Sequence, residues 1–165
     1  VTALDVAEEL GASLKIILNG GNAKIGIEST VIDIRKKPII LRPGFISSKK
    51  LSFILKVATI SKNKKSNIIS PGQQKKHYSP GIPMFLNTKK RPQNHAYVIF
   101  GKKHINGDNI FNLSKKGNLE EAAKNLYKTL RLIKKKKFKK IYVMKIPDKN
   151  IGIAINDRLK KASAK

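Results

Sequence analysis

The sequence predicts an α/β protein made of two structured regions joined by a long linker. Apolar residues at strand and helix spacing recur through residues 1–57 and again through residues 84–165. Between them, residues 58–83 are rich in Ser, Lys, Asn and Pro and show no sustained periodicity. The 165 residues suffice for one ordinary domain or two small ones, and an apolar fraction of 40% allows a packed core.

The first region begins with a predicted helix. Thr2 stands at the N-cap position, Asp5 follows three residues later as in a capping box, and Gly11 is a natural stop. Residues 14–18 are apolar enough to predict a short buried strand, which the turn Asn19-Gly20-Gly21 ends.

A hairpin and a second helix are predicted next. Residues 25–34 and 38–41 have strand-like composition, and the polar residues 35–37 between them suit a hairpin connection. Ser47 is placed to cap a short helix. The apolar face of that helix would carry Leu51, Ile54 and Leu55.

The second region alternates strand and helix patterns. Residues 96–100, 110–113 and 141–144 are predicted strands. Asn118 can cap a helix whose apolar stripe comprises Leu119, Ala122, Ala123, Leu126, Leu130 and Ile133. A last helix from about Ile151 carries Ile155, Leu159 and Ala162 on one side. This order predicts a small parallel α/β layer.

The charge is strongly positive, with a formal net value of +26. Such a charge raises the prospect of nucleic-acid binding. However, 31 of the 36 basic residues are Lys, whereas bidentate recognition of phosphates and guanines favours Arg. Lys, Ile and Asn all have A/T-rich codons, so codon bias is a second explanation. The Lys-rich residues 134–140 are the best candidate for contact with tRNA or other double-stranded RNA.

Several classes of function are excluded or disfavoured by composition. The chain has no Cys, which excludes a disulfide framework, a thiol nucleophile and a thiolate metal site. No apolar run approaches the roughly 20 residues of a membrane-spanning helix, and no secretory signal is evident. We therefore expect no membrane association and a cytoplasmic location. Neither a phosphate-binding glycine loop nor His/Cys metal spacing is present.

Three segments carry candidate binding chemistry. Ser29 and Thr30 stand in a strand-like run, where their hydroxyls could bind a small polar ligand or serve no purpose. Arg42 ends a predicted strand before a Pro-Gly turn, a position that suits a phosphate ligand or an ordinary surface arginine. His77 and Tyr78 lie between two Pro-Gly turns in the linker, where they could fold over a phosphate-bearing ligand or be incidental.

These segments resemble, in order and spacing, one family. Gly-Ile-Glu-Ser-Thr-Val-Ile-Asp at residues 26–33 and Ile-Leu-Arg-Pro-Gly at residues 40–44 resemble the closing half of a YrdC domain. Ser-Pro-Gly at residues 70–72 and His-Tyr-Ser-Pro at residues 77–80 resemble the linker of the longer Sua5 form.

Two further segments resemble the domain appended in that longer form. They are Asn-Leu-Tyr-Lys-Thr-Leu-Arg at residues 125–131 and Gly-Ile-Ala-Ile-Asn-Asp-Arg-Leu at residues 152–159. The chain is thus similar to the C-terminal portion of the Sua5/YrdC/YciO family of threonylcarbamoyl-AMP synthases. The resemblance implies the C-terminal half of a twisted YrdC-like α/β domain (residues 1–57), a linker or lid (58–83) and a small Rossmann-like Sua5 domain (84–165).

The resemblance also implies a reaction. L-threonine, bicarbonate and ATP, with Mg²⁺, would give threonylcarbamoyl-AMP and pyrophosphate, and the product would feed the machinery that transfers threonylcarbamoyl to tRNA. By resemblance, Ser29 and Thr30 would contact threonine, Arg42 would hold an ATP phosphate, and His77 and Tyr78 would close over the nucleotide. No protein nucleophile or resident metal ligand is implied, so none is assigned.

One expectation concerns the extent of the chain. In this family a Lys-x-Arg pair and a Ser-x-Asn loop stand in the first half of the YrdC domain, and the resemblance places both before Val1. We therefore expect the chain alone neither to fold stably nor to turn over. Gln73 stands where many relatives have Met, which we regard as tolerated. The alternative is a basic RNA-binding α/β module without catalysis.

Overall fold

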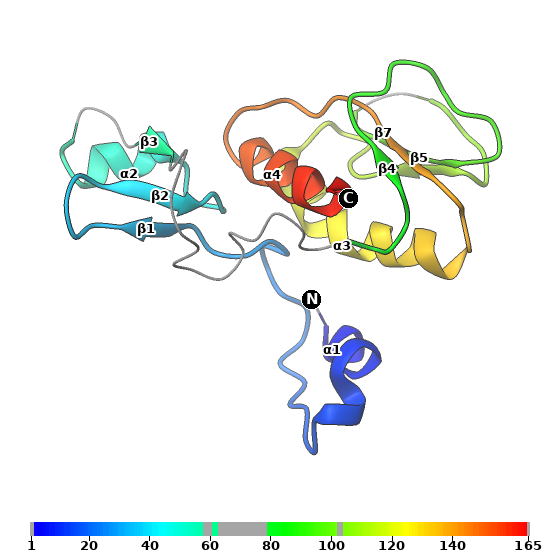
Figure 1. Cartoon of the computed structure of the whole chain (residues 1–165), viewed down its shortest axis with the longest axis horizontal. Helices are drawn as coiled ribbons and strands as arrows, with labels where there is room; N and C mark the ends of the chain where they lie inside the picture. The colour runs from blue at the N-terminus through cyan, green and yellow to red at the C-terminus, as the bar shows by residue number, and fades with distance from the viewer. Residues whose placement is uncertain (1, 58–60, 63–78, 102–103, 165) are drawn as a thin grey trace.

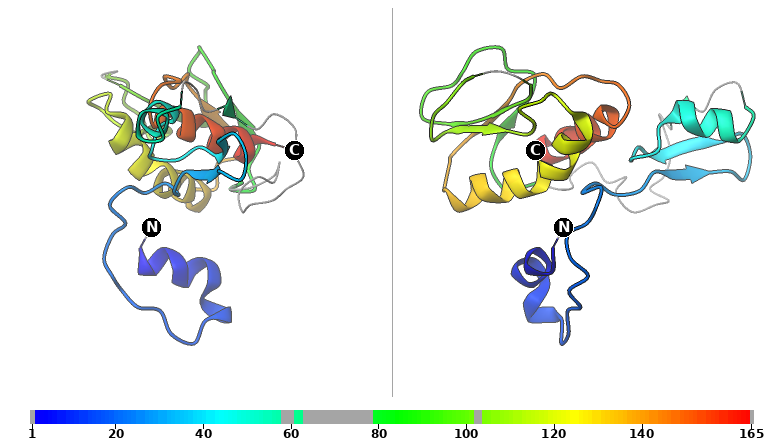
Figure 2. Two further views of the ribbon diagram at one scale, coloured as in Figure 1. Left: turned by 90° about the vertical axis from the view of Figure 1, so that its left-hand side faces the viewer. Right: turned by 180° about the vertical axis from the view of Figure 1, so that it is seen from behind.

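The computed structural model describes residues 2–57, 61–62, 79–101 and 104–164, and these form two sheets. A three-stranded sheet in the order β1-β2-β3 comes from the first part of the chain, and a four-stranded sheet in the order β4-β7-β5-β6 comes from the last part. The two sheets stand side by side, and α1 lies outside both, below α3 (Figure 1). The view from behind shows the same separation (Figure 2).

The four-stranded sheet is parallel throughout. It comprises β4 (Met84–Phe85), β5 (Ala96–Ile99), β6 (Ile110–Asn112) and β7 (Ile141–Val143). All four residues of β5 are buried, as expected of a strand in a covered parallel sheet. We call residues 84–164 the C-terminal unit, and its mixed α/β architecture confirms the predicted fold class.

The helices of the C-terminal unit match their predicted patterns. In α3 (Leu119–Lys135), the Asn118 side chain accepts a hydrogen bond of 2.9 Å from the Glu121 amide and so caps the helix. The buried face of α3 is the predicted stripe from Ala122 to Ile133. In α4 (Gly152–Ser163), Ile155, Leu159 and Ala162 are buried as predicted. Both helices belong to one core with β5 and β7.

The predicted start of the chain is right for the helix and wrong for the strand. Thr2 and Asp5 form the capping box of α1 (Ala3–Leu10), with distances of 2.9 and 3.1 Å. Gly11 does not end it in a left-handed turn but begins the 3₁₀ turn η1 (Gly11–Ser13) with a right-handed φ of −51°. Residues 14–18 form no strand, and Ile16 is 80% exposed. An apolar run becomes a strand only where another strand can bond to it.

The predicted hairpin is confirmed in its second half. Strand β1 (Val31–Asp33) pairs antiparallel with β2 (Ile39–Arg42), and Ser47 caps α2 (Ser48–Ile54) as predicted. Residues 25–30 are irregular rather than extended into β1. Within the predicted linker, β3 (Ser61–Lys62) adds a short parallel strand beside β2, which the sequence did not indicate.

The first region has little core of its own. Among the described residues, twelve of the fourteen exposed large apolar side chains lie between Leu4 and Leu55. By contrast, the core of the structure is almost entirely in the C-terminal unit, and Ile27 is the residue of the first region that enters it. In the part of the chain that the structure describes, no helix has the length and apolar character needed to cross a bilayer. The predicted boundaries at residues 57/58 and 83/84 stay predictions.

Candidate functional site

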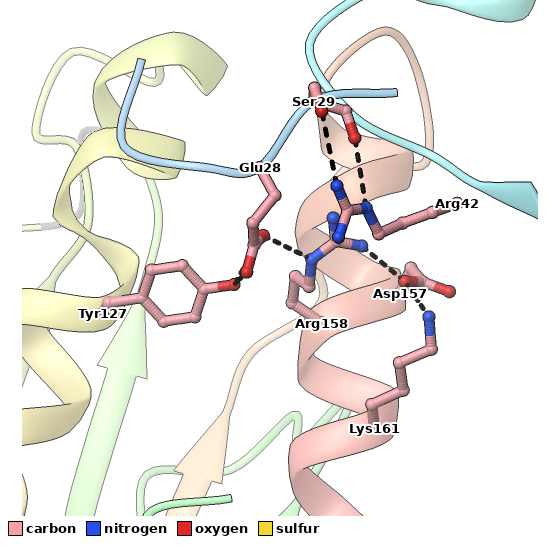
Figure 3. Close-up of polar contacts among 7 residues, drawn as sticks. All are labelled: Glu28, Ser29, Arg42, Tyr127, Asp157, Arg158 and Lys161. Atoms are coloured by element: carbon pink, nitrogen blue, oxygen red, sulfur yellow. Dashed lines mark hydrogen bonds and ion pairs between the residues drawn. The ribbon is translucent and has the colours of Figure 1, made fainter. Parts of the chain in front are cut away.

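Three predicted site residues lie beside the start of β1, and two of them, Ser29 and Arg42, are in contact. The Arg42 guanidinium donates from Nε to the Ser29 carbonyl at 3.2 Å and from Nη2 to the Ser29 Oγ at 3.3 Å (Figure 3). The Thr30 hydroxyl donates to the Ile46 carbonyl at 2.8 Å. Because β1 and β2 pair antiparallel, the end of β2 lies beside the start of β1, and this pairing brings Arg42 to Ser29.

Gly44 holds this segment tightly. The residue is buried, and a Cβ there would overlap backbone atoms of Glu28, Ser29 and Thr30. The turn after β2 therefore packs directly on the backbone that carries the two hydroxyls. Ser29 and Arg42 thus form a polar cluster with Thr30 beside it, in which Ser29 is exposed and the Thr30 hydroxyl is bonded to the Ile46 carbonyl. Such a group can bind a small polar or anionic ligand.

Glu28, the residue before Ser29, joins this cluster to the C-terminal unit. Its carboxylate accepts hydrogen bonds from the Tyr127 hydroxyl at 2.9 and 3.0 Å and from Arg158 Nε at 2.8 Å (Figure 3). The Arg158 side chain is only 1% exposed, and it also pairs with Asp157 at 2.6 Å. Lys161 in turn contacts Asp157 at 2.7 Å.

The charge on Glu28 is favoured by these contacts. Partial burial alone would raise the pKa of the Glu28 carboxyl, but the hydrogen bond and the positive charge of Arg158, with the Tyr127 hydroxyl, lower it below its ordinary value. Three polar residues in a row on a helix, as at residues 156–158, are usually solvated, but the Arg158 side chain is buried. The run Asn-Asp-Arg gave no local signal of a partner 130 residues away.

Helix α1 makes a second set of charged contacts with α3. Arg131 Nη2 lies 2.8 Å from Asp5 Oδ2, and Lys135 Nζ lies 2.7 Å from Glu8 Oε1. The groove between the two helices encloses about 930 Å³, and Ser79 is among its lining residues. Arg131 and Lys135 are 26% and 61% exposed, against 1% for Arg158, so water screens these two pairs more than the Glu28–Arg158 pair.

The other predicted residues fall in different places. His77, Tyr78 and Gln73 lie outside the described residues. The lysines of residues 134–140 are exposed at the end of α3 and beyond it, as the RNA-binding interpretation requires, and Lys135 uses its charge on Glu8. Across the described ranges, no three His, Cys, Asp or Glu side chains gather where they could hold a metal ion.

The fold and this cluster define an α/β protein with two sheets, in which the parallel sheet and helices of the C-terminal unit are joined through Glu28 to the Ser-Thr-Arg cluster beside the smaller sheet. Residues 46–164 match the family described as threonylcarbamoyl-AMP synthase, C-terminal domain. The chain therefore belongs to that family.

Curated relatives carry the same description. The chain is 27% identical to the threonylcarbamoyl-AMP synthase of Pyrococcus abyssi over 98% of its own length and 53% of that protein. It is 28% identical to the Bacillus subtilis enzyme of the same name over 96% of its own length and 51% of that protein. The chain thus spans about half the length of the curated relatives it matches.

Solved structures agree with this relationship. The crystal structure of P. abyssi Sua5 complexed with L-threonine superposes with a TM-score of 0.83 at 28% identity, over 98% of this chain and 53% of that one. A second structure is of P. abyssi Sua5 with an adjacent His-Tyr pair changed to alanine. It superposes with a TM-score of 0.78 at 26% identity, over 98% of this chain and 52% of that one.

Proposed function

We propose that this chain is the C-terminal portion of a synthase that forms threonylcarbamoyl-AMP and pyrophosphate from L-threonine, bicarbonate and ATP. The product would serve the transfer of threonylcarbamoyl to tRNA. The observation that carries the proposal is the contact of Arg42 with Ser29, in a fold that superposes on a relative solved with L-threonine. Family membership over residues 46–164 supports it.

The proposed chemistry needs positioned charge more than a protein nucleophile. The threonine amine combines with the CO₂ of bicarbonate to give a carbamate, with water as the by-product, and a carbamate oxygen then attacks the α-phosphorus of ATP. The bond from that phosphorus to the pyrophosphate oxygen breaks, and pyrophosphate leaves. Negative charge accumulates on the phosphates, so a fixed cation lowers the barrier.

Each residue of the cluster has a proposed role. Ser29 and Thr30 contact threonine, and Arg42 reaches an ATP phosphate beside it, because its guanidinium already lies on Ser29. Mg²⁺ is proposed to arrive with ATP as part of the substrate, since this ion is usually held in part by phosphates.

His77 and Tyr78 are proposed to close over the nucleotide. They form the one His-Tyr dipeptide of the 165-residue sequence. A His-Tyr pair is also the position changed to alanine in one of the P. abyssi structures. A lid of this kind would exclude water from the reacting phosphate.

The 165-residue chain alone is proposed to be inactive, since it spans about half of its relatives. The test measures pyrophosphate release from ATP and bicarbonate, with and without L-threonine. It compares this chain with the same chain joined to the remaining half of a synthase, which we call the extended chain. We expect threonine-dependent release from the extended chain only. Threonine-dependent pyrophosphate release by the 165-residue chain would contradict its proposed inactivity. If neither chain releases pyrophosphate in a threonine-dependent way, the proposed synthase function is contradicted.

Arg42→Ala in the extended chain tests the site itself. The matched control is Arg35→Ala, because the Arg35 side chain is 76% exposed and pairs with Asp33 on the same hairpin. We expect Arg42→Ala to lower threonine-dependent release by about 100-fold or more, the scale of one lost transition-state contact, and Arg35→Ala to leave it unchanged. Equal rates for the two variants would remove Arg42 from the site.

The RNA-binding alternative keeps one supporting observation, the exposed lysines of residues 134–140. It predicts that tRNA binds the chain with an affinity that falls steeply with salt. If tRNA binds and no threonine-dependent reaction is found in the extended chain, the alternative replaces the synthase proposal.

A further inference from the structure

The segment just before Ser29 is packed inside the C-terminal unit. Ile27 is 8% exposed and belongs to the same buried cluster as Leu126 and Ile155. Gly26 has a φ of +73°, and a Cβ there would lie 2.6 Å from Lys124 Cα on α3. The chain therefore enters the core of the C-terminal unit at residues 26–27 and meets α3 at backbone contact.

Glu28 fixes the same segment by charge. Arg158 is almost completely buried, and a buried guanidinium is strongly unfavourable without a negative partner. Glu28 and Asp157 supply that negative charge, and Tyr127 donates to Glu28 from α3. Withdrawing Glu28 would leave Arg158 with less compensation in a dry environment, so the docked position of residue 28 is favoured.

Ser29 follows directly, and one peptide unit spans only about 3.8 Å. On its other side, Arg42 and Gly44 hold the same backbone. Figure 3 shows Glu28 pointing to Tyr127 and Arg158, while Ser29 meets Arg42. Ser29 is therefore held from two directions, by the C-terminal unit before it and by the end of β2 beside it.

We propose that the C-terminal unit positions Ser29 for L-threonine through Glu28, with Arg158 and Tyr127 as its anchor. Glu28 and Arg158 are then positioning residues of the threonine site rather than groups that touch the substrate. This inference rests on the proposed function, because it takes Ser29 to be a threonine contact. It gives the C-terminal unit a part in shaping the threonine site, through residues that do not themselves touch the substrate.

The first test needs no activity. In the extended chain, NMR follows solvent exchange of the Arg42 Nε–H, which donates to the Ser29 carbonyl. Glu28→Gln is compared with Glu8→Gln, which also removes a carboxylate paired with a basic residue, but at the exposed pair between α1 and α3. We expect exchange to rise about 10-fold in Glu28→Gln and not in Glu8→Gln. Equal exchange in both would overturn the positioning of Ser29.

The second test measures threonine dependence in the extended chain. We expect Glu28→Gln to raise the KM for L-threonine about 10-fold, with the KM for ATP and the kcat within about 2-fold of wild type. A raised KM for threonine with unchanged KM for ATP and kcat indicates weaker threonine binding, because general loss of structure would change all three. A KM for threonine equal to that of Glu8→Gln would overturn the proposal. No threonine dependence in the wild type would instead sink the proposed function, while the exchange measurement would still decide whether Glu28 positions Ser29.

A third comparison separates positioning from folding. Glu28→Gln together with Arg158→Met removes both charges, so no uncompensated guanidinium stays buried and much of the stability should return. The anchor is still absent, so the KM for threonine should stay raised about 10-fold. A double variant with wild-type KM would show that the pair serves stability only, and would overturn the proposal.

Discussion

Replacing Gly26 by alanine would push a methyl group into α3 at a position where the backbone is already left-handed. The φ of +73° costs an L-residue about 1–2 kcal/mol. The new Cβ would also lie 2.6 Å from Lys124 Cα, and overpacking of this kind costs about 1–3 kcal/mol. The two effects together predict a loss of about 2–5 kcal/mol. The loss cannot exceed the free energy with which residues 26–28 dock on α3, because the segment can detach and so avoid the clash.

Gly21→Ala is the matched control. Gly21 has a φ of +81°, and a Cβ added there would have no neighbouring atom within 4 Å. Gly21→Ala therefore carries the cost of a left-handed backbone but not the cost of a steric clash. Urea unfolding of the extended chain is followed by circular dichroism at 222 nm, because the 165 residues contain no Trp that would report on this segment. Gly26→Ala should lose about 1–3 kcal/mol more than Gly21→Ala, a midpoint shift of about 1 M urea for a protein of this size. If the two variants unfold at the same urea concentration, the segment does not pack on α3 in solution.

Three further changes have defined outcomes. Leu126 is fully buried on α3, so Leu126→Ala should lower the free energy of unfolding in urea by about 2–5 kcal/mol. Leu132 is 43% exposed on the same helix, so Leu132→Ala should lower it by less than about 1 kcal/mol. Similar losses for the two variants would contradict the assigned core face of α3. The folded pKa of Glu28 is lowered, so its contribution to stability is full above the ordinary value of 4.5 and declines as the pH falls through the lower folded value. Glu28→Gln should therefore flatten the acid side of the stability profile, and an unchanged slope below pH 4.5 would refute this. Asn118→Ala should cost about 1 kcal/mol through loss of the bond to the Glu121 amide, measured by the same unfolding, and no loss would show that the cap is unimportant.

The C-terminal unit was largely predictable because its signals are local. A cap at Asn118 and a stripe of apolar residues define α3 without reference to the rest of the chain. Strand β4, only two residues long, was missed because its existence depends on pairing with β7. The predicted strand at residues 14–18 was wrong for the same reason, because composition shows that a segment is apolar but not that a partner strand is present.

The candidate site divides in the same way. Arg42 and Ser29 could be expected to meet, because a short polar connection between two strand-like runs predicts a hairpin. The contact of Glu28 with Arg158 joins residues 130 positions apart, and no periodicity encodes it. A charged residue on a helix is ordinarily solvated, so the burial of Arg158 became evident only from the fold.

The position of Arg158 near the end of the 165-residue sequence has a consequence for synthesis of the protein. Chains emerge from the ribosome from the N-terminus, at about 5–20 residues per second. Glu28 is therefore made long before its partner, and segment 26–28 must wait for α4 before its docking contacts are complete. A premature stop in α4 before Arg158 would leave every described strand of both sheets in place and yet remove this support from Ser29.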